Sequence, residues 1–171
     1  MFQDEARFGR MSHPRACWAP LPHRPTVGLA LVREFRYEYA AVSPWDGSLD
    51  YMTAQRMKTE DMSRFLDQVS NAHKDDFVVM VLDGAPSHKS KDLKAPENIV
   101  LIPLPPYSPE LSPAEQIWNV LRRDYFANRV FDSLDAATHQ AETGLAHMAS
   151  NKQALKKLTN WPWIHAILNA K

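Results

Sequence analysis

Periodic apolar positions predict helices in this chain. Residues 59–73 repeat apolar side chains at i, i+3, i+4 and i+7, the spacing of one buried helical face: Met62, Phe65, Leu66 and Val69. Thr59 stands where the cap of this helix is expected. Further helices are predicted over residues 112–128, 133–149 and 152–169. Pro162 is expected to kink or restart the last one, because proline lacks the amide hydrogen used in a helix interior.

Strand-like segments precede and separate these helices. They are a short first strand ending at Asp4 and residues 26–35, 36–42, 48–54, 77–82 and 99–104. Residues 77–82 are continuously apolar, which is typical of a strand covered on both faces. Residues 10–25 hold four prolines and predict a loop, and residues 44–47 predict a turn. The order favours an α/β fold, with a mixed sheet that has an antiparallel and a parallel part.

Composition limits the class of protein. The 171 residues suit one domain, and 44% hydrophobic with 23% charged residues is ordinary for a globular protein. No apolar run is long enough to cross a bilayer and no signal peptide is recognisable, so we expect a cytoplasmic, nucleoid-associated protein without a membrane partner. The single cysteine, Cys17, excludes an internal disulfide. The histidines show no paired spacing with cysteines, which disfavours structural zinc.

Two carboxylates stand at the ends of predicted strands. Asp83 directly follows the apolar run 77–82, where burying an unpaired charge would be very costly. Ligand sites gather at such strand ends in open α/β sheets. The alternative is a turn or helix cap at Asp83. Asp4, beside Glu5 near the chain start, is by default part of a solvated pair, so its case depends on the other acidic residues.

A third carboxylate, Glu115, has two readings. Ser112 to Glu115 matches a capping box, with Ser112 as the N-cap and Pro113 as the first helical residue. The proline-rich lead-in over residues 105–109 is an unusual way to place a mere cap, which favours a functional role. Three acidic side chains without a histidine or cysteine cluster suit Mg²⁺, or Mn²⁺ in its place, rather than zinc. Two such ions about 3.5–4 Å apart can clamp both oxygens of a phosphoryl displacement.

Polar and basic residues near these carboxylates are candidates for supporting roles. His88 either orients a phosphate or metal-bound water or is an exposed loop histidine. Lys89, Gln116 and Asn119 are likewise candidates to support a metal ligand or to position a phosphate, with a solvated surface as the alternative. The net charge of zero argues mildly against a free-standing nucleic-acid binder, but an acidic centre can offset basic walls. Candidate contacts to the DNA backbone are Arg7, Arg15, Arg24, Lys91, Arg122 and Arg123.

Three segments together resemble the catalytic domain of bacterial insertion-sequence transposases related to mariner, in the Asp-Asp-Glu superfamily. They are Phe-Gln-Asp-Glu-Ala-Arg-Phe-Gly at 2–9, Leu-Asp-Gly-Ala-Pro-Ser-His-Lys-Ser at 82–90, and Pro-Pro-Tyr-Ser-Pro-Glu-Leu-Ser-Pro-Ala-Glu-Gln-Ile-Trp at 105–118. The third segment is highly specific, the second fairly so, and the first is weak alone. Thirty-one residues separate Asp83 from Glu115, near the spacing typical of this family.

The resemblance implies a ribonuclease H-like mixed five-stranded sheet flanked by helices, with extra C-terminal helices. It implies that Asp4, Asp83 and Glu115 are the catalytic residues and the ligands of two Mg²⁺ ions. The implied reaction is cleavage at transposon ends and strand transfer into target DNA. The implied partner is double-stranded DNA, namely terminal inverted repeats and a TA-containing target, with a homodimer assembled on it.

We expect residues 1–171 to form a single catalytic domain. We expect this domain to lack the helix-turn-helix region with which such transposases recognise their terminal repeats. Two alternatives stay open: a structure-selective nuclease of the same fold, and a catalytically silent transposase fragment that acts as an interaction module.

Overall fold

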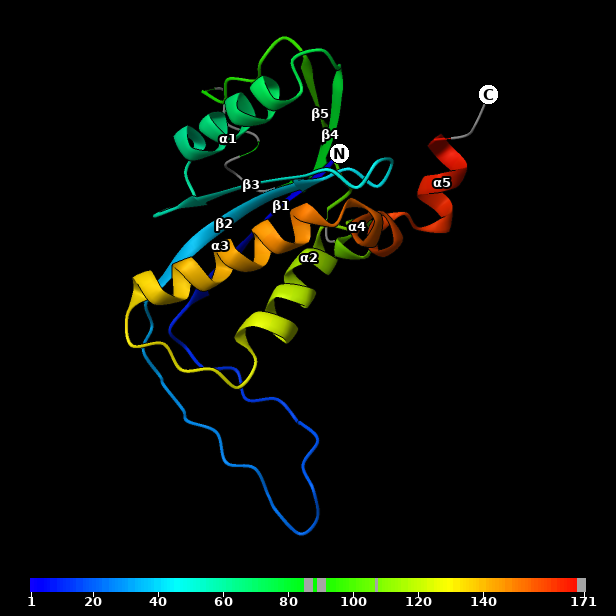
Figure 1. The fold of residues 1–171 in the computed structure, drawn as a ribbon. Helices are drawn as coiled ribbons and strands as arrows, with labels where there is room; N and C mark the ends of the chain where they lie inside the picture. The colour runs from blue at the N-terminus through cyan, green and yellow to red at the C-terminus, as the bar shows by residue number, and fades with distance from the viewer. Residues whose placement is uncertain (85–87, 89–91, 107, 169–171) are drawn as a thin grey trace.

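A five-stranded sheet forms the centre of the protein (Figure 1). The computed structural model describes residues 1–84, 88, 92–106 and 108–168. The strands are β1 (Phe2–Gly9), β2 (Phe35–Val42), β3 (Leu49–Ala54), β4 (Val78–Leu82) and β5 (Ile99–Pro103). Their order is β3-β2-β1-β4-β5, with β1 to β3 antiparallel and β4 and β5 parallel to β1. The predicted mixed five-stranded sheet is therefore confirmed.

Helices cover both faces of this sheet (Figure 1). α1 (Thr59–Ala72) packs on one face, and α2 (Glu115–Val120) and α3 (Leu134–Ser150) pack on the other. α4 (Lys152–Thr159) and α5 (Pro162–Leu168) complete the described chain, so Pro162 does restart the last helix. Ser133 and Asn151 cap α3 and α4 by accepting hydrogen bonds from backbone amides inside each helix.

The core consists of two apolar clusters, one on each face. Beneath α1, the four periodic side chains of the helix are fully buried with Tyr39, Met80 and Leu82. On the other face, Phe2 and Phe8 of β1 pack against Trp118 and Leu121. The apolar residues of β1, namely Phe2, Ala6 and Phe8, all belong to this second cluster, and β1 lies in the middle of the sheet between β2 and β4. β1 is consequently a central, tightly held strand, which matters for the residues it carries.

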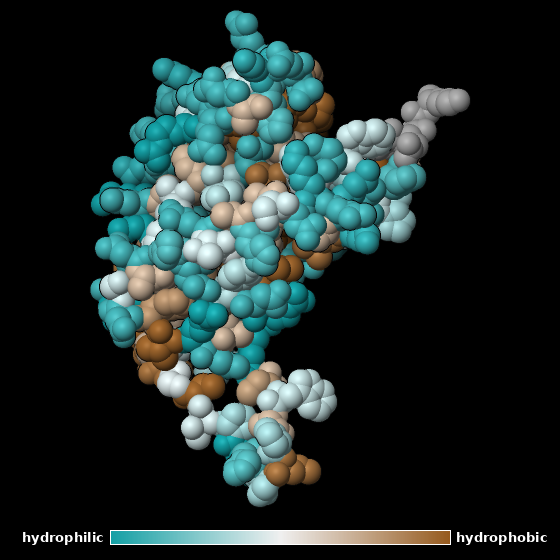
Figure 2. All heavy atoms as spheres, in the orientation of Figure 1, coloured by the Kyte–Doolittle hydropathy of each residue, from teal (hydrophilic) through white to brown (hydrophobic). Residues whose placement is uncertain are grey.

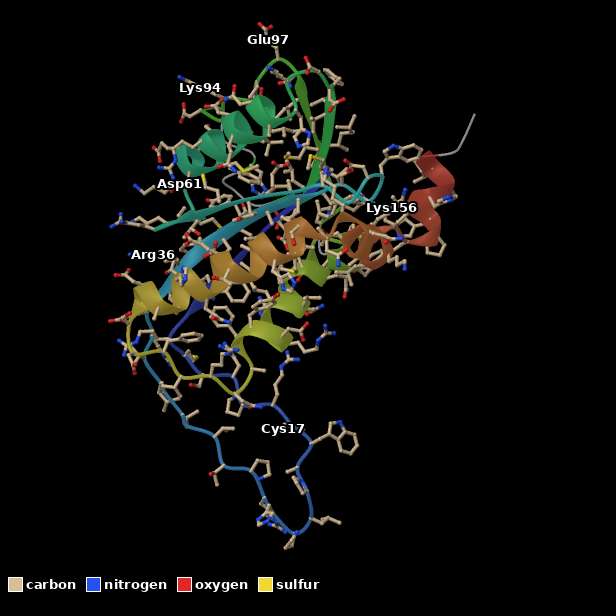
Figure 3. All side chains as sticks on the ribbon, viewed as in Figure 1. Cys17, Arg36, Asp61, Lys94, Glu97 and Lys156 are labelled. Carbon is tan, nitrogen blue, oxygen red and sulfur yellow. The ribbon has the colours of Figure 1, made fainter. Side chains whose placement is uncertain are left out.

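The segment predicted as a strand over residues 26–35 is not one. Only Phe35 belongs to β2, and residues 10–34 form a long arm that leaves the body of the protein (Figure 1). Apolar side chains of the arm, Leu29 and Leu31 among them, are exposed, and Figure 2 shows the arm standing clear of the rest of the surface. A strand needs neighbours to pair with, and the described chain offers this segment none beyond the base of the arm, where Ser12 bonds Ala30. Cys17 also lies on the arm and is exposed (Figure 3).

Other boundaries also differ from the prediction. α2 begins only at Glu115 and gives way to a π-helical turn, η3 (Leu121–Phe126), where a single helix over residues 112–128 was predicted. Gly144 lets α3 approach this turn, since a side chain there would collide with Leu121 and Tyr125. Thr59 is the first residue of α1 and not its cap; among the described residues no side chain caps this helix.

The prediction that β4 is covered on both faces is wrong on one side. Val79 of β4 and Val100 and Ile102 of β5 are exposed, because the described helices on that face lie over β1 to β3 and do not extend to this edge. Among the described residues, no helix combines the length and the apolar character that crossing a membrane requires.

Candidate active site

Sheet register brings the first two carboxylates together. β1 and β4 run parallel with Phe2 beside Val81, which places Asp4 next to the end of β4, where Asp83 follows Leu82. Asp4 itself lies inside β1, which continues to Gly9, so the prediction that it ends a strand is wrong. The strand is long here because β2 pairs with it along its whole length. The central strand thus holds Asp4 beside the end of the neighbouring strand.

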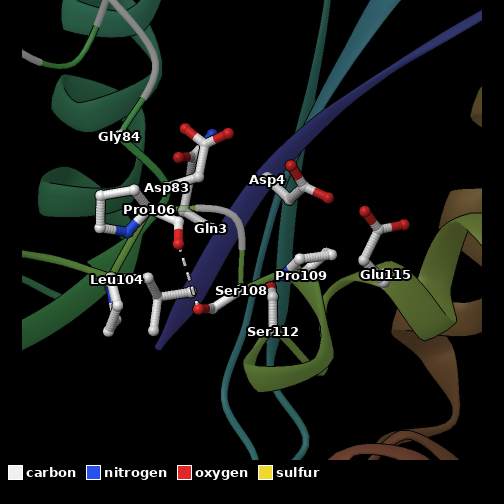
Figure 4. Close-up of a pocket in the computed structure, with 11 residues that line it drawn as sticks. Gln3, Asp4, Asp83, Gly84, Leu104, Pro106, Ser108, Pro109, Ser112 and Glu115 are labelled. Carbon is white, nitrogen blue, oxygen red and sulfur yellow. Dashed lines mark hydrogen bonds between the residues drawn. The ribbon is translucent and has the colours of Figure 1, made fainter.

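The third carboxylate reaches the same place from a distant segment. After β5, the chain passes over Leu104 and Pro105 into a 3₁₀ turn, η2 (Pro109–Leu111), and then into α2. Asp4, Asp83 and Glu115 all line one pocket of about 450 Å³ (Figure 4). The rest of its lining comes from Gln3, Gly84, Ser112 and the described residues of 104–109. The proline-rich segment therefore forms a wall of the pocket as well as the lead-in to α2.

Both oxygens of Asp4 are held. Its Oδ1 accepts a hydrogen bond from the Glu5 amide, and its Oδ2 accepts one from Nε1 of Trp118, each at 2.9 Å. Burial, followed by the negative charge of Glu115, raises the pKa of Asp4 to about 7 although these hydrogen bonds lower it. A carboxyl group this costly to ionise beside a second carboxylate is typical of a site whose charge a cation offsets.

The structure contradicts the interpretation of Glu115 as part of a capping box. Ala114 is the N-cap of α2, and no side chain caps it among the described residues. The hydroxyl of Ser112, which a capping box would use, is buried without a hydrogen-bond partner in the described part of the chain. The side chain of Glu115 points into the pocket toward Asp4 (Figure 4). Of the two readings, the pocket position is the one that the fold forms.

His88 is buried between two carboxylates, so the alternative of an exposed loop histidine is wrong. Its Nε2 lies 2.9 Å from Oε1 of Glu5, and its Nδ1 lies 2.9 Å from Oδ1 of Asp83. Burial lowers the pKa of His88, but the bonds to Glu5 and Asp83 outweigh it and raise the pKa to about 9. At neutral pH both ring nitrogens therefore donate, one to each carboxylate.

The remaining candidates differ in where they lie and in what they contact. Asn119 and Arg122 are one and two turns after Glu115 on the same side of its helix, and Arg122 stacks over the ring of Phe8. Arg123 is paired with Asp124 through two nitrogens. The others are Gln116, partly buried on α2, Arg7, which lies over Phe35, and Arg15 and Arg24, both exposed on the arm. Lys89 and Lys91 lie outside the described residues.

Three residues of the site escaped prediction. Glu5 was read as half of a solvated pair, yet its side chain is 4% exposed. Trp118 was quoted only as part of a motif, and Gln3 was given no role although both atoms of its amide are buried without a partner among the described residues. One signal was available: neighbours on a strand face opposite ways, so Asp4 and Glu5 cannot serve the same partner.

The donor set suits a divalent cation in kind. All three carboxylates offer hard oxygen atoms, and a cation near Asp4 and Glu115 would relieve the repulsion that raises the pKa of Asp4. Within the described residues, no three acidic, histidine or cysteine side chains lie close enough to hold one ion together. Binding by all three carboxylates therefore requires their side chains to close in on the ion.

Comparison with known proteins identifies the class. Residues 1–154 match the family model of the DDE superfamily endonuclease. The uncharacterized protein y4pE/y4sA of Sinorhizobium fredii (strain NBRC 101917 / NGR234) is 34% identical over 129 residues, which are 74% of this chain and 87% of that protein. The chain belongs to the DDE superfamily of endonucleases. The membership of the Asp-Asp-Glu superfamily that the three motifs implied is thereby confirmed.

Solved structures agree at the level of the fold. The Mos1 strand transfer complex matches with a TM-score of 0.62 and 17% identity over 91% of this chain and 51% of that one. The Mos1 mariner paired end complex with Mn matches with a TM-score of 0.63 and 14% identity, over 96% and 54%. This chain spans about half the length of these structures. The predicted ribonuclease H-like fold is confirmed.

Proposed function

We propose that this chain is the catalytic domain of a DNA transposase, which cuts phosphodiester bonds and joins the freed 3′ end to target DNA. The observation that carries the proposal is that Asp4, Asp83 and Glu115 line one pocket in a domain of the DDE superfamily. Side-chain packing alone gives no reason to bring three carboxylates together from three distant segments, because their like charges repel one another.

The proposed roles follow from the positions of these side chains. Asp4, Asp83 and Glu115 would hold two Mg²⁺ ions, with Mn²⁺ as a substitute. The bound metal would supply the activation of the attacking oxygen and the stabilisation of the leaving one. Trp118 and the Glu5 amide fix the carboxylate of Asp4, and the described residues of 104–109 bound the space beside it. No protein side chain then needs to act as nucleophile or general base.

The proposed partner is double-stranded DNA. The Mos1 structures of the same fold are a strand transfer complex and a paired end complex. The proposed substrates are transposon ends and a TA-containing target, and the proposed assembly is a homodimer, as the resemblance of the three motifs implies. Arg122, beyond Glu115 on the same side of its helix, is suited to a phosphate. Arg123 is a weaker candidate, since Asp124 already pairs with it.

One experiment separates joining from cutting. Incubation with a nicked, labelled transposon-end duplex and a supercoiled TA-containing plasmid in Mn²⁺ should yield plasmid-linked label if the protein is a transposase domain. Cleavage without linked label would assign a structure-selective nuclease. If the protein is folded and binds Mn²⁺ but gives neither product, it would be assigned as a catalytically silent fragment.

We expect divalent metal to stabilise the protein. A ligand present at a hundredfold excess over its dissociation constant adds about 2.7 kcal/mol to the stability of the state it binds, which is roughly 5–10 °C in Tm for a domain of this size. Thermal melts in Mn²⁺, Mg²⁺ and EDTA measure this rise. The parent protein should show it and Asp83→Asn should not. Indistinguishable melts for the two proteins at millimolar Mn²⁺ would contradict the proposed metal site.

We also expect DNA binding to be weak and governed by salt. The formal net charge is zero and the candidate contacts are arginines and lysines, which bind phosphates without reading sequence. Fluorescence anisotropy should give equal affinities for two duplexes that differ only in a central TA step, and a steep linear loss of affinity with the logarithm of salt concentration. Strong selectivity for one duplex at high salt would contradict this.

A further inference from the structure

We propose that Glu5, acting through His88, is a positioning residue that sets the orientation of the Asp83 carboxylate for metal binding. The inference rests on the proposed metal-binding role of Asp83. It gives a role to Glu5, which lies on the opposite face of β1 from Asp4.

The geometry is a continuous chain of three side chains. Glu5 Oε1 lies 2.9 Å from Nε2 of His88, and Nδ1 of the same ring lies 2.9 Å from Oδ1 of Asp83. Nδ1 also lies 3.1 Å from the backbone carbonyl oxygen of Asp83. The imidazole is therefore held at both nitrogens, and the ring has one orientation that satisfies both partners. A contact with Glu5 at one end thus determines where the ring presents its N–H at the other.

Burial shows that this chain of contacts is built into the fold. The side chains of His88 and Glu5 are 1% and 4% exposed, whereas that of Asp83 is 58% exposed and opens to the pocket. The two inner members lie within the protein and the outer one meets its ligands. Carboxylate–histidine pairs that orient a metal ligand in this way are common around metal centres. Here the oriented ligand is a carboxylate, and His88 is the group that supports it.

Glu5, the inner end of this chain of contacts, lies on the central strand of the sheet. β1 pairs with β2 on one side and β4 on the other, and Glu5 stands opposite Tyr39, which is fully buried. Asp83, by contrast, lies just beyond the last residue of β4, where the strand no longer holds it. Alternation along β1 sends Asp4 to one face and Glu5 to the other. One strand thereby places the first carboxylate directly and the second through His88.

The test measures Mn²⁺ affinity by the electron paramagnetic resonance signal of free Mn²⁺, which does not depend on catalysis. Glu5→Ala should weaken binding by about 10–100-fold, the usual cost of removing a group that supports a metal ligand. Glu5→Gln keeps an oxygen that accepts from Nε2 of His88, so it should restore most of the affinity. In the double variant Glu5→Ala/His88→Gln, the loss should be no greater than in His88→Gln alone, because two residues in one chain of contacts are not additive.

His88→Gln also provides a test of the inference in case the Glu5→Ala protein does not fold. A glutamine amide can still donate to Glu5, which keeps that buried carboxylate paired, but it cannot also reach Asp83. The matched control is Asp50→Ala. His73 Nε2 lies 2.8 Å from Asp50 Oδ2, a histidine–carboxylate pair of the same kind that does not line the pocket. Its loss should lower Tm and leave Mn²⁺ affinity unchanged.

Three results would overturn the inference: unchanged Mn²⁺ affinity in Glu5→Ala, additive losses in the double variant, or equal damage from Glu5→Gln and Glu5→Ala. The last would show that the charge of Glu5 acts on the metal itself. A parent protein that binds Mn²⁺ but neither cuts nor joins DNA would contradict the proposed function alone, and the pattern among the variants would still support or overturn this inference. A parent protein that binds no Mn²⁺ overturns both.

Discussion

Replacing Glu115 by glutamine should abolish metal-dependent DNA cleavage and leave the metal-free protein at least as stable as the parent. Glu115 faces Asp4 across the pocket, and its charge contributes, after burial, to raising the pKa of Asp4 to about 7. Removing that charge makes the ionisation of Asp4 less costly, so the metal-free protein should not lose stability. Glutamine cannot supply the negative oxygen that the proposed ions require, so cleavage should fall by more than the roughly 10–100-fold expected for a merely supporting residue.

The measurement pairs melts with a cleavage assay. Glu115→Gln should show no rise in Tm with Mn²⁺, while its Tm in EDTA should equal or exceed that of the parent. Glu110→Gln is the matched control: the same substitution in the preceding turn, at an exposed residue that does not line the pocket. It should keep both the metal response and the cleavage. If Glu115→Gln retained the full metal response, the catalytic assignment of this residue would be wrong.

Replacing Glu38 by glutamine should stabilise the protein strongly above neutral pH and hardly at all at pH 5. Glu38 is fully buried on β2, and its Oε1 has no hydrogen-bond partner among the described residues. Its Oε2 accepts a hydrogen bond from Thr53, which also contacts Glu142. Burial raises the pKa of Glu38 from 4.5 to about 7; the bond from Thr53 lowers it and Glu142 raises it further.

The direction of the pH dependence follows from this raised pKa. Between about pH 4.5 and 7 the folded protein keeps a proton that the unfolded chain releases, so the stabilisation is complete below pH 4.5 and is lost as pH rises through 7. The shift corresponds to a loss on the order of 3 kcal/mol. Glutamine carries no charge at any pH, so the Glu38→Gln protein does not undergo this loss of stability. Asp4 titrates in the same range, but it is present in both proteins and cancels in their difference.

Urea denaturation in EDTA at pH 5 and pH 8 measures the effect. The difference between Glu38→Gln and the parent should be small at pH 5 and approach its full size at pH 8. Glu142→Gln, at the exposed neighbour, is the control and should change stability much less. A gap of equal size at both pH values would show that Glu38 is ionised throughout.

Local patterns predicted those parts of the fold that local physics determines. The helical face of residues 59–73 was predicted because the spacing of its apolar side chains is a property of the segment itself, and all four are buried. The turn before β3 follows from the same logic, since Gly47 adopts the positive φ of 77° that glycine tolerates. The strand predicted over residues 26–35 was wrong for a corresponding reason: strand propensity does not show whether a sheet is there to pair with the segment.

The sequence by itself was enough to predict the mixed sheet, the amphipathic helices and the three candidate carboxylates, because the motifs that carry them are continuous in the chain. Only the tertiary structure decided what those carboxylates meet. Asp4 and Trp118 are 114 positions apart, and Glu5 and His88 are 83 apart, yet each pair is hydrogen-bonded. Contacts at such separation depend on strand register and helix packing, which no local pattern records. The same reason explains why Glu115 looked like a cap in sequence and lines a pocket in the fold.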